Sequence, residues 1–155
     1  MEKPDSPTIQ KARQVSALLK QLSDDEIEKI APLFRVRNIP RGTTVLRPGE
    51  GRGRFGVVVS GELDLMEDTE LKGNPLLLGR LREGGLLAHP TIFDVETPHI
   101  SVVAHEESRL LVMSKESFEN MLDHYPEIGI KILKEIIRVQ FIRLRSMADR
   151  LAKVF

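Results

Sequence analysis

The sequence predicts an α+β domain in which an antiparallel β-barrel or jelly roll, a double-stranded β-helix, is flanked by N-terminal helices and one long C-terminal helix. Between Phe34 and Val112, short apolar runs alternate with clusters of glycine, proline and polar residues, a pattern typical of antiparallel strands joined by turns. Helix-capping residues stand on both sides of this region, and no proline interrupts residues 127–155. A chain of 155 residues suffices for one domain with a single core.

The composition argues against several classes of protein. Lysine plus arginine number 23 and aspartate plus glutamate also number 23, so no overall charge attracts nucleic acid or an anionic membrane. The chain has no cysteine, which excludes disulfides and thiolate metal sites. Its apolar runs are far shorter than a membrane span, and its N-terminus has no signal-peptide pattern. We therefore expect a cytoplasmic protein that binds neither nucleic acid nor membrane.

The N-terminal part is expected to contain a tail followed by short helices. Residues 1–14 contain prolines and polar residues without a periodic apolar face, so we expect a flexible tail there. Residues 15–22, VSALLKQL, predict a short helix. Ser23 then predicts the N-cap of a second helix, because Glu26 lies three residues later and completes a capping box.

Residues 15–126 are expected to hold these helices and the barrel. Turns rich in glycine separate the strand-forming runs, among them the turns at Gly42, Gly49 and Gly61. After the last run, Ser114 predicts the N-cap of a further helix. The runs with strand character are LFRVRNI, TTVLR, RFGVVVSGELDLME, PLLLGRL, HISVVA and SRLLVMS.

The last segment, residues 127–155, predicts a long helix with an apolar seam whose residues recur at alternating steps of three and four. Ile130 and Leu133 are expected to pack on the barrel. Beyond about Ile137 the helix is expected to project past the barrel, which leaves an apolar stripe for a second copy of the chain. We expect a homodimer through this helix, with a fold-back or a different partner helix as the alternatives. The residues assigned to the dimer interface, which we call the seam, are Ile137, Phe141, Leu144, Ala148, Leu151 and Phe155.

Several strings of the sequence, in their order and spacing, resemble one known family. LLKQLSDDEIEKIAPLF is similar to the opening helices of the cyclic-nucleotide-binding domain, and MLDHYPEIGIKILKEI is similar to the proline-marked step into its last helices. Between them, Gly42, the pair Gly49-Glu50 and the triplet Ser60-Gly61-Glu62 match the glycine and glutamate positions of its barrel. The resemblance covers roughly residues 16–150 and is to the sensor domain of catabolite-activator-like proteins.

The resemblance implies a phosphate-binding cassette, and this sequence departs from the family's pattern there. Binding members read approximately Phe-Gly-Glu, several residues, then Arg-Ala-Ala/Ser-Thr/Ser, with the glutamate on the ribose hydroxyl and the arginine on the cyclic phosphate. A match without gaps puts His89 at the glutamate position and Pro98 at the arginine position. Proline supplies no side-chain donor, and histidine cannot accept as a carboxylate does. The degenerate cassette positions are Leu87, Ala88, His89, Pro98, His99, Ile100 and Ser101.

Other polar residues leave alternatives open. A slip of one residue would put His99 at the arginine position, where its charge near neutral pH is only fractional. Arg47, Arg52 and Arg54 surround a glycine-rich turn that either is merely exposed or contacts an anion. His89 and His99 could be a metal or proton-transfer pair, but no third ligand stands at a recognisable spacing, so we interpret them as polar loop residues.

Four arginines of the long helix have two interpretations as well. Arg138, Arg143, Arg145 and Arg150 are expected to form the solvated face of the helix, and they would also suit an acidic partner. Like these arginines, His105 and His124 are expected at the surface.

These observations predict a non-enzymatic, degenerate cyclic-nucleotide-binding-like module of bacterial-type signalling. We expect it to act through protein–protein contacts, as a homodimer and with a further protein partner, and to need no cofactor or metal. No nucleophile elbow and no HExxH motif is present. The alternative is a small-ligand sensor that binds a cyclic nucleotide or another anion through non-standard residues. A third hypothesis is a DNA-binding regulator that has lost its DNA-binding unit. It is considered because no helix-turn-helix pattern occurs before the sequence ends at Phe155. The balanced charge disfavours this hypothesis.

Overall fold

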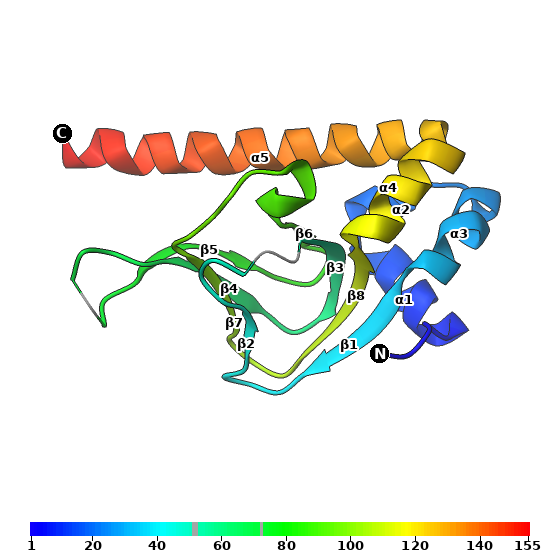
Figure 1. The fold of residues 1–155 in the computed structure, drawn as a ribbon, viewed down its shortest axis with the longest axis horizontal. Helices are drawn as coiled ribbons and strands as arrows, with labels where there is room; N and C mark the ends of the chain where they lie inside the picture. Colours follow the sequence, from blue (N-terminus) through cyan, green and yellow to red (C-terminus); the bar gives the residue numbers. More distant parts are fainter. Residues whose placement is uncertain (51–52, 72) are drawn as a thin grey trace.

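The computed structural model describes residues 1–50, 53–71 and 73–155 of the chain. Within them, two four-stranded antiparallel sheets form a jelly roll, with short helices at one end and a long helix along one side (Figure 1). This arrangement confirms the predicted fold class. One sheet has the order β1-β8-β3-β6 and the other the order β2-β7-β4-β5. The strands are β1 (Arg35–Ile39), β2 (Thr44–Leu46), β3 (Arg54–Ser60), β4 (Leu63–Glu67), β5 (Leu76–Leu81), β6 (Leu86–Ala88), β7 (Ile100–Ala104) and β8 (Ser108–Ser114).

The two central strands of the first sheet are buried on both faces. On β8, Leu111 and Met113 point into a cluster shared with the helices, whereas Leu110 and Val112 point into the cluster between the sheets. Successive side chains of a strand alternate between faces, so these strands need continuous apolar runs. Such runs carry no alternating pattern, yet their length and the flanking turn residues made them recognisable in the sequence.

Strand β6 had no counterpart among the predicted strands. It contains only three residues, and it pairs with β3 through the register Gly56↔Leu87, more than thirty positions apart in the chain. A strand this short is stabilised by pairing with its distant partner strand, and its three residues show no sequence pattern of their own. It matters for function because it leads directly into the cassette.

The expected flexible tail is a helix in the structure. Helix α1 (Ser6–Val15) begins at the N-cap Asp5, whose carboxylate accepts a hydrogen bond from the Thr8 backbone N–H at 2.9 Å. Ala12 is fully buried against the rest of the core. The prediction for residues 1–14 was wrong because small residues make up the buried face, and small residues give a weak periodic signal.

The next helices follow their capping residues. Helix α2 (Ala17–Lys20) is followed by α3 (Asp24–Ile30), where Ser23 and Glu26 form the predicted capping box. A short 3₁₀ helix, η1 (Ala31–Leu33), leads into β1. After β8, α4 (Lys115–His124) begins at Ser114, whose hydroxyl accepts from the Ser117 N–H at 3.1 Å. Both predicted N-caps are thus confirmed.

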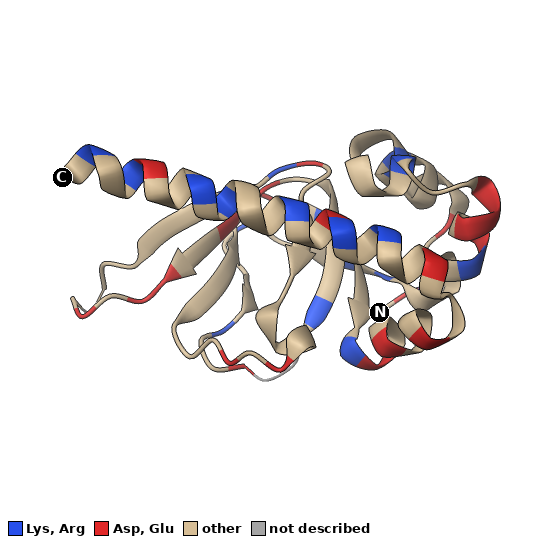
Figure 2. Cartoon of the chain, turned by 90° about the horizontal axis from the view of Figure 1, so that it is seen from above, with Lys and Arg blue, Asp and Glu red and all other residues tan. Residues whose placement is uncertain are grey.

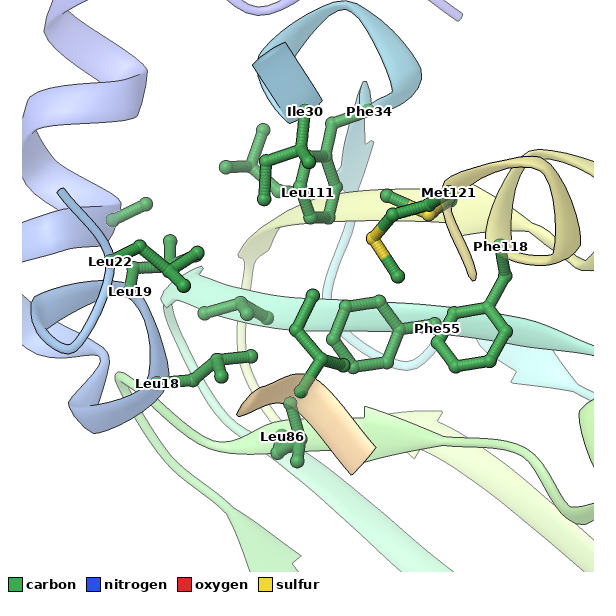
Figure 3. Close-up of a cluster of buried hydrophobic side chains, with 14 of the residues drawn as sticks. Leu18, Leu19, Leu22, Ile30, Phe34, Phe55, Leu86, Leu111, Phe118 and Met121 are labelled. Carbon is green, nitrogen blue, oxygen red and sulfur yellow. The ribbon is translucent and has the colours of Figure 1, made fainter. Parts of the chain in front are cut away.

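Three phenylalanines join these helices to the first sheet (Figure 3). The ring of Phe55 lies 6.2 Å from that of Phe34 and 5.5 Å from that of Phe118, measured between centroids. All three side chains are buried, and each contributes about 1.5–3 kcal/mol of hydrophobic stabilisation. The helical layer is therefore packed firmly on the end of the barrel.

Helix α5 (Pro126–Val154) runs along the barrel and extends beyond its far end (Figure 1). Ile128, Ile132 and Ile136 are its buried face, and Ile130 is 52% exposed, so the expectation that Ile130 packs on the barrel was wrong. Leu133 is partly buried in the core as expected. The helix does not leave the barrel at Ile137, because Arg150 still donates hydrogen bonds to carbonyl oxygens of β5.

Candidate functional site

A cavity of about 320 Å³ lies between the second sheet, the segment after β6 and helix α5. Its volume falls in the range of small-molecule sites. Except for His89, Gln140 and Arg143, the side chains that line it are apolar. Leu87, Ala88 and Ile100 of the predicted cassette positions belong to this lining. The structure therefore has a partly open cavity at the place where the resemblance implied a site.

His89 ends strand β6 and caps the short 3₁₀ helix η2 (Pro90–Phe93). Its ring is buried, with 4% of the residue exposed, so the interpretation as a surface loop residue was wrong. Nδ1 contacts the Thr91 hydroxyl and accepts from the Thr91 N–H at 3.3 Å, and Nε2 lies 3.2 Å from the Thr97 hydroxyl. A ring that accepts at Nδ1 carries its proton on Nε2 when it is neutral, which makes Nε2 the donor to Thr97.

Burial also determines the charge of this histidine. Desolvation lowers the pKa of His89 below its usual value of 6.5, and the Glu50 carboxylate opposes the shift by a smaller amount. The ring is therefore neutral near pH 7. It supplies no positive charge to the cavity, and its hydrogen-bonding atoms are already engaged.

The backbone at the start of η2 is engaged as well. Pro90 has no N–H, the Thr91 N–H donates to the His89 ring, and the Ile92 N–H donates to the His89 carbonyl oxygen at 3.0 Å. The first turn of a helix binds an anion through N–H groups that have no partner within the helix. At these three positions, none remains for a phosphate.

A glycine allows the loop before β3 to approach the cassette. A Cβ atom on Gly53 would lie 2.6 Å from the Ile92 backbone nitrogen and 2.6 Å from the Thr91 hydroxyl. Only glycine fits at such a distance without displacing backbone. The position of η2 therefore depends on Gly53.

The remaining cassette positions lie outside the cavity. Pro98 and His99 are exposed in the turn before β7, and Ser101 pairs with Met66 of β4. The His99 carbonyl oxygen accepts from the Asp68 N–H at 2.8 Å. Neither the residue at the predicted arginine position nor its neighbour thus offers a cation to the site.

The basic turn that was an alternative anion contact does not line the cavity in the described part of the chain. The Arg47 N–H donates to the Glu50 carboxylate at 2.9 Å, which closes the turn. Arg54 borders a separate groove and reaches the Met1 sulfur at 3.7 Å. Arg52 lies outside the described residues.

Arg143 is the cation that sequence reasoning missed. Its half-buried side chain lines the cavity, and burial alone lowers its pKa, with no charged neighbour contributing. No acceptor for its guanidinium occurs among the described residues. The signal was present, because Ile136, Gln140, Arg143 and Met147 continue the buried face of α5 at steps of four, three and four.

The other arginines of α5 have different surroundings, although Figure 2 shows basic residues along the whole helix. Arg138 pairs with the buried Glu135, whose second partner is Gln21 of the segment after α2. Arg150 donates to the carbonyl oxygens of Leu77 and Leu78 at 3.4 and 2.9 Å. Arg138 and Arg150 are exposed as expected, although both also make hydrogen bonds within the chain, whereas Arg143 is half-buried, so the interpretation as a solvated face was wrong for Arg143.

The two remaining histidines, His105 and His124, lie at the surface as expected. His105 is partly exposed and its Nδ1 lies 3.2 Å from the Asp64 carboxylate, and His124 is exposed on the last turn of α4. Over residues 1–50, 53–71 and 73–155, no three histidine, aspartate or glutamate side chains gather as a metal site. In the same residues, no helix is both long enough and apolar enough to cross a bilayer.

The jelly roll thus holds an apolar cavity between its second sheet, a short capped 3₁₀ helix and the long helix α5. The sequence model of the cyclic nucleotide-binding domain matches residues 36–125. The chain therefore belongs to the cyclic nucleotide-binding domain family.

Comparisons with individual proteins agree with this membership. Human cGMP-dependent protein kinase 2 is 26% identical over 113 residues, which are 72% of this chain and 15% of the kinase. A cyclic nucleotide-binding domain from Methylobacillus flagellatus superposes with a TM-score of 0.83 at 18% identity, covering 96% of this chain and 86% of that one. The catabolite activator protein of Thermus thermophilus superposes with a TM-score of 0.72 at 24% identity, covering 90% and 63%. These structural similarities support the fold.

Proposed function

We propose that the chain is a non-enzymatic, cytoplasmic signalling module of bacterial type that does not hold cAMP or cGMP by the usual contacts. It acts through protein–protein contacts, as a homodimer along α5 and with a further protein partner. Membership of a family of regulatory domains supports the signalling role. The fold itself is compatible with binding and non-binding members, so the argument depends on the site.

The observation that carries the proposal is the way His89 closes the cassette on itself. Its ring and carbonyl oxygen take the N–H groups of Thr91 and Ile92, and Pro90 contributes none. At the other end of the cassette, Pro98 is exposed and has no donor. A cyclic phosphate placed against η2 and Pro98 would lose its water without gaining from these residues the charged, bidentate partner that compensates for desolvation.

The free energy lost with the missing arginine is large enough to argue against ordinary binding of a cyclic nucleotide. Removing one partner of a buried, hydrogen-bonded charge pair costs about 2–5 kcal/mol, which is roughly 30-fold to several thousand-fold in affinity. A site with a dissociation constant of about 1 μM would thereby weaken to between about 30 μM and several millimolar.

Isothermal titration calorimetry of the whole chain with cAMP, cGMP and a cyclic dinucleotide tests the proposal. We expect dissociation constants of about 30 μM or weaker for all three. A dissociation constant near 10 μM or tighter for any of them would show that the cassette binds a nucleotide and would overturn the proposal.

A second candidate function is a small-ligand sensor that uses non-standard residues. The apolar cavity and the Arg143 side chain on its wall favour it. Here Arg143 takes the place of the anion contacts expected at Arg47, Arg52, Arg54 or His99. Neither candidate function includes ordinary binding of a cyclic nucleotide. They differ in whether a small ligand binds in the cavity.

A further inference from the structure

We propose that the cavity binds a small organic monoanion, an alkyl or aryl carboxylate, with its apolar part against the leucine-rich walls and its carboxylate on Arg143. This inference rests on the second candidate function and gives the chemical class of the ligand. Its charged contact, Arg143, lies on α5 and outside the family's phosphate cassette.

The walls argue for an apolar ligand body. Leu65 and Leu78 of the second sheet, Phe93 and Val95 after β6, and Met147 of α5 all line the cavity. A nucleotide presents a sugar hydroxyl, a ring phosphate and the polar edge of a base, and few groups of this lining could satisfy them. A hydrocarbon chain or a phenyl ring leaves no polar atom unpaired on such walls.

The anionic end of the ligand follows from Arg143. Its side chain is half-buried, borders both this cavity and the groove beside β5, and has no hydrogen-bond acceptor among the residues that the structure describes. Desolvation lowers its pKa, which means that the present surroundings disfavour the charge. A carboxylate accepts two parallel hydrogen bonds from a guanidinium and would compensate for that desolvation.

The other two polar residues of the lining, His89 and Gln140, indicate how many negative charges the ligand carries. His89 is neutral and hydrogen-bonded to Thr91 and Thr97, so it adds no cation. Gln140 lies one helical turn before Arg143 on the same face of α5 and can donate from its amide. One guanidinium and one amide suit a single carboxylate better than a dianion.

The position of Arg143 also gives the ligand a means of signalling. Phe141 and Leu144, which belong to the seam, flank Arg143 on α5. A ligand held between the barrel walls and Arg143 would fix this part of α5 against the barrel. Binding would then be coupled to whatever α5 contacts, because ligand and partner would both depend on the placement of one helix.

The test is calorimetry of the full chain with two carboxylates, octanoate and 4-phenylbutyrate, and with their uncharged counterparts octanamide and 4-phenylbutyramide. We expect at least one carboxylate to bind with a dissociation constant below about 1 mM and at least tenfold more tightly than its amide. The variant Arg143→Gln should weaken that carboxylate roughly 10- to 100-fold and leave the amide nearly unchanged.

Arg145→Gln is the matched control, because Arg145 is exposed on the same helix and does not line the cavity. The inference is wrong if neither carboxylate binds, if the amides bind equally well, or if Arg145→Gln weakens binding as much as Arg143→Gln. Titration of the same samples with cAMP keeps the two proposals apart. Tight cAMP binding contradicts the proposed function, whereas failure of the carboxylates alone contradicts only the ligand class.

Discussion

At the scale of single residues, His89 shows how one side chain can satisfy the backbone of the turn that follows it. It occupies the position where the resemblance implied a glutamate, and its ring satisfies the backbone that a ligand would otherwise meet. The sequence comparison identified the substitution, but only the structure shows that the ring turns inward and is buried. Contacts with Thr91 and Thr97 hold the His89 ring in this inward position. No known sequence motif pairs a histidine with threonines at these two spacings.

The lowered pKa of His89 predicts a pH-dependent stability. Between its folded pKa and 6.5 the unfolded chain binds the proton and the folded chain does not, so stability falls as the pH drops below 6.5. The slope from one proton is at most about 1.4 kcal/mol per pH unit. In urea unfolding between pH 5 and 7.5, His89→Asn should remove this slope, because asparagine can still cap η2 and does not titrate.

His99→Asn is the control for this experiment, because His99 is exposed in the described structure. The control should keep the slope of the wild type. If His89→Asn and the wild type lose stability equally on acidification, burial of a neutral ring is not the cause.

Gly53 predicts a second effect at the residue scale. Gly53→Ala should destabilise the fold by about 1–3 kcal/mol, since the new methyl group would overlap the backbone of η2 and force a shift. Gly79→Ala is a matched control, because a Cβ atom at Gly79 meets nothing within 4 Å. Thermal denaturation of the two variants compares them directly, and equal melting temperatures would contradict the close approach of loop and cassette.

At the scale of elements, the strands and caps were predictable because their signals are local. Turn glycines, apolar runs and the capping pairs at Ser23 and Ser114 act within a few residues, and the structure agrees with them. Helix α1 and strand β6 were missed because their stability comes from distant partners. Arg143 was missed for a related reason: the sequence shows that it lies on a helix, but the surface that this helix covers is determined by the barrel.

Helix α5 is joined to the N-terminal helices by polar contacts as well as by its isoleucines. Glu135 has 6% of its surface exposed and accepts from Arg138 and from the Gln21 amide at 3.3 Å. The hydrogen bond from Arg138, and secondarily that from Gln21, lowers the pKa of Glu135 below 4.5 despite desolvation. These contacts fix the start of α5, from which the helix crosses the cavity.

Glu135→Gln should therefore lower stability at pH 7 by about 1 kcal/mol, the typical net value of a hydrogen bond. Because the folded pKa is depressed, the contribution of Glu135 is fully present above pH 4.5 and is lost as the pH falls through the folded value. The difference between variant and wild type in urea unfolding should shrink below pH 4.5. Asp149→Asn, a change at an exposed position of the same helix, should leave the wild-type profile unaltered.

At the scale of the whole molecule, the two faces of α5 have different surroundings. The face toward the cavity continues from Ile128 through Ile132 and Ile136, and it packs on this chain's own barrel. The seam lies on other sides of the helix and is largely exposed: Ile137 by 54%, Phe141 by 67%, Leu144 by 62% and Leu151 by 61%. The helix packs along its own barrel, and this packing leaves the seam exposed.

The spacing of the seam favours a second copy of the same helix as its cover. Its members follow one another at steps of four, three, four, three and four, which is the heptad repeat of a coiled coil. On a parallel pair, the flanking positions would bring Gln140 near Arg145 of the other copy and Met147 near Ala152, so no like charges would meet.

We therefore predict that the chain is a dimer and that Leu144→Asp makes it a monomer, because two carboxylates would be buried in the centre of the seam. Ser146→Asp introduces the same charge on another side of the helix, where it borders the groove beside β5, and should remain a dimer. Light scattering coupled to size-exclusion chromatography gives the mass of each variant, and circular dichroism shows whether α5 stays folded. If the wild type and Leu144→Asp have the same monomeric mass, the seam is not a homodimer interface and another partner must cover it.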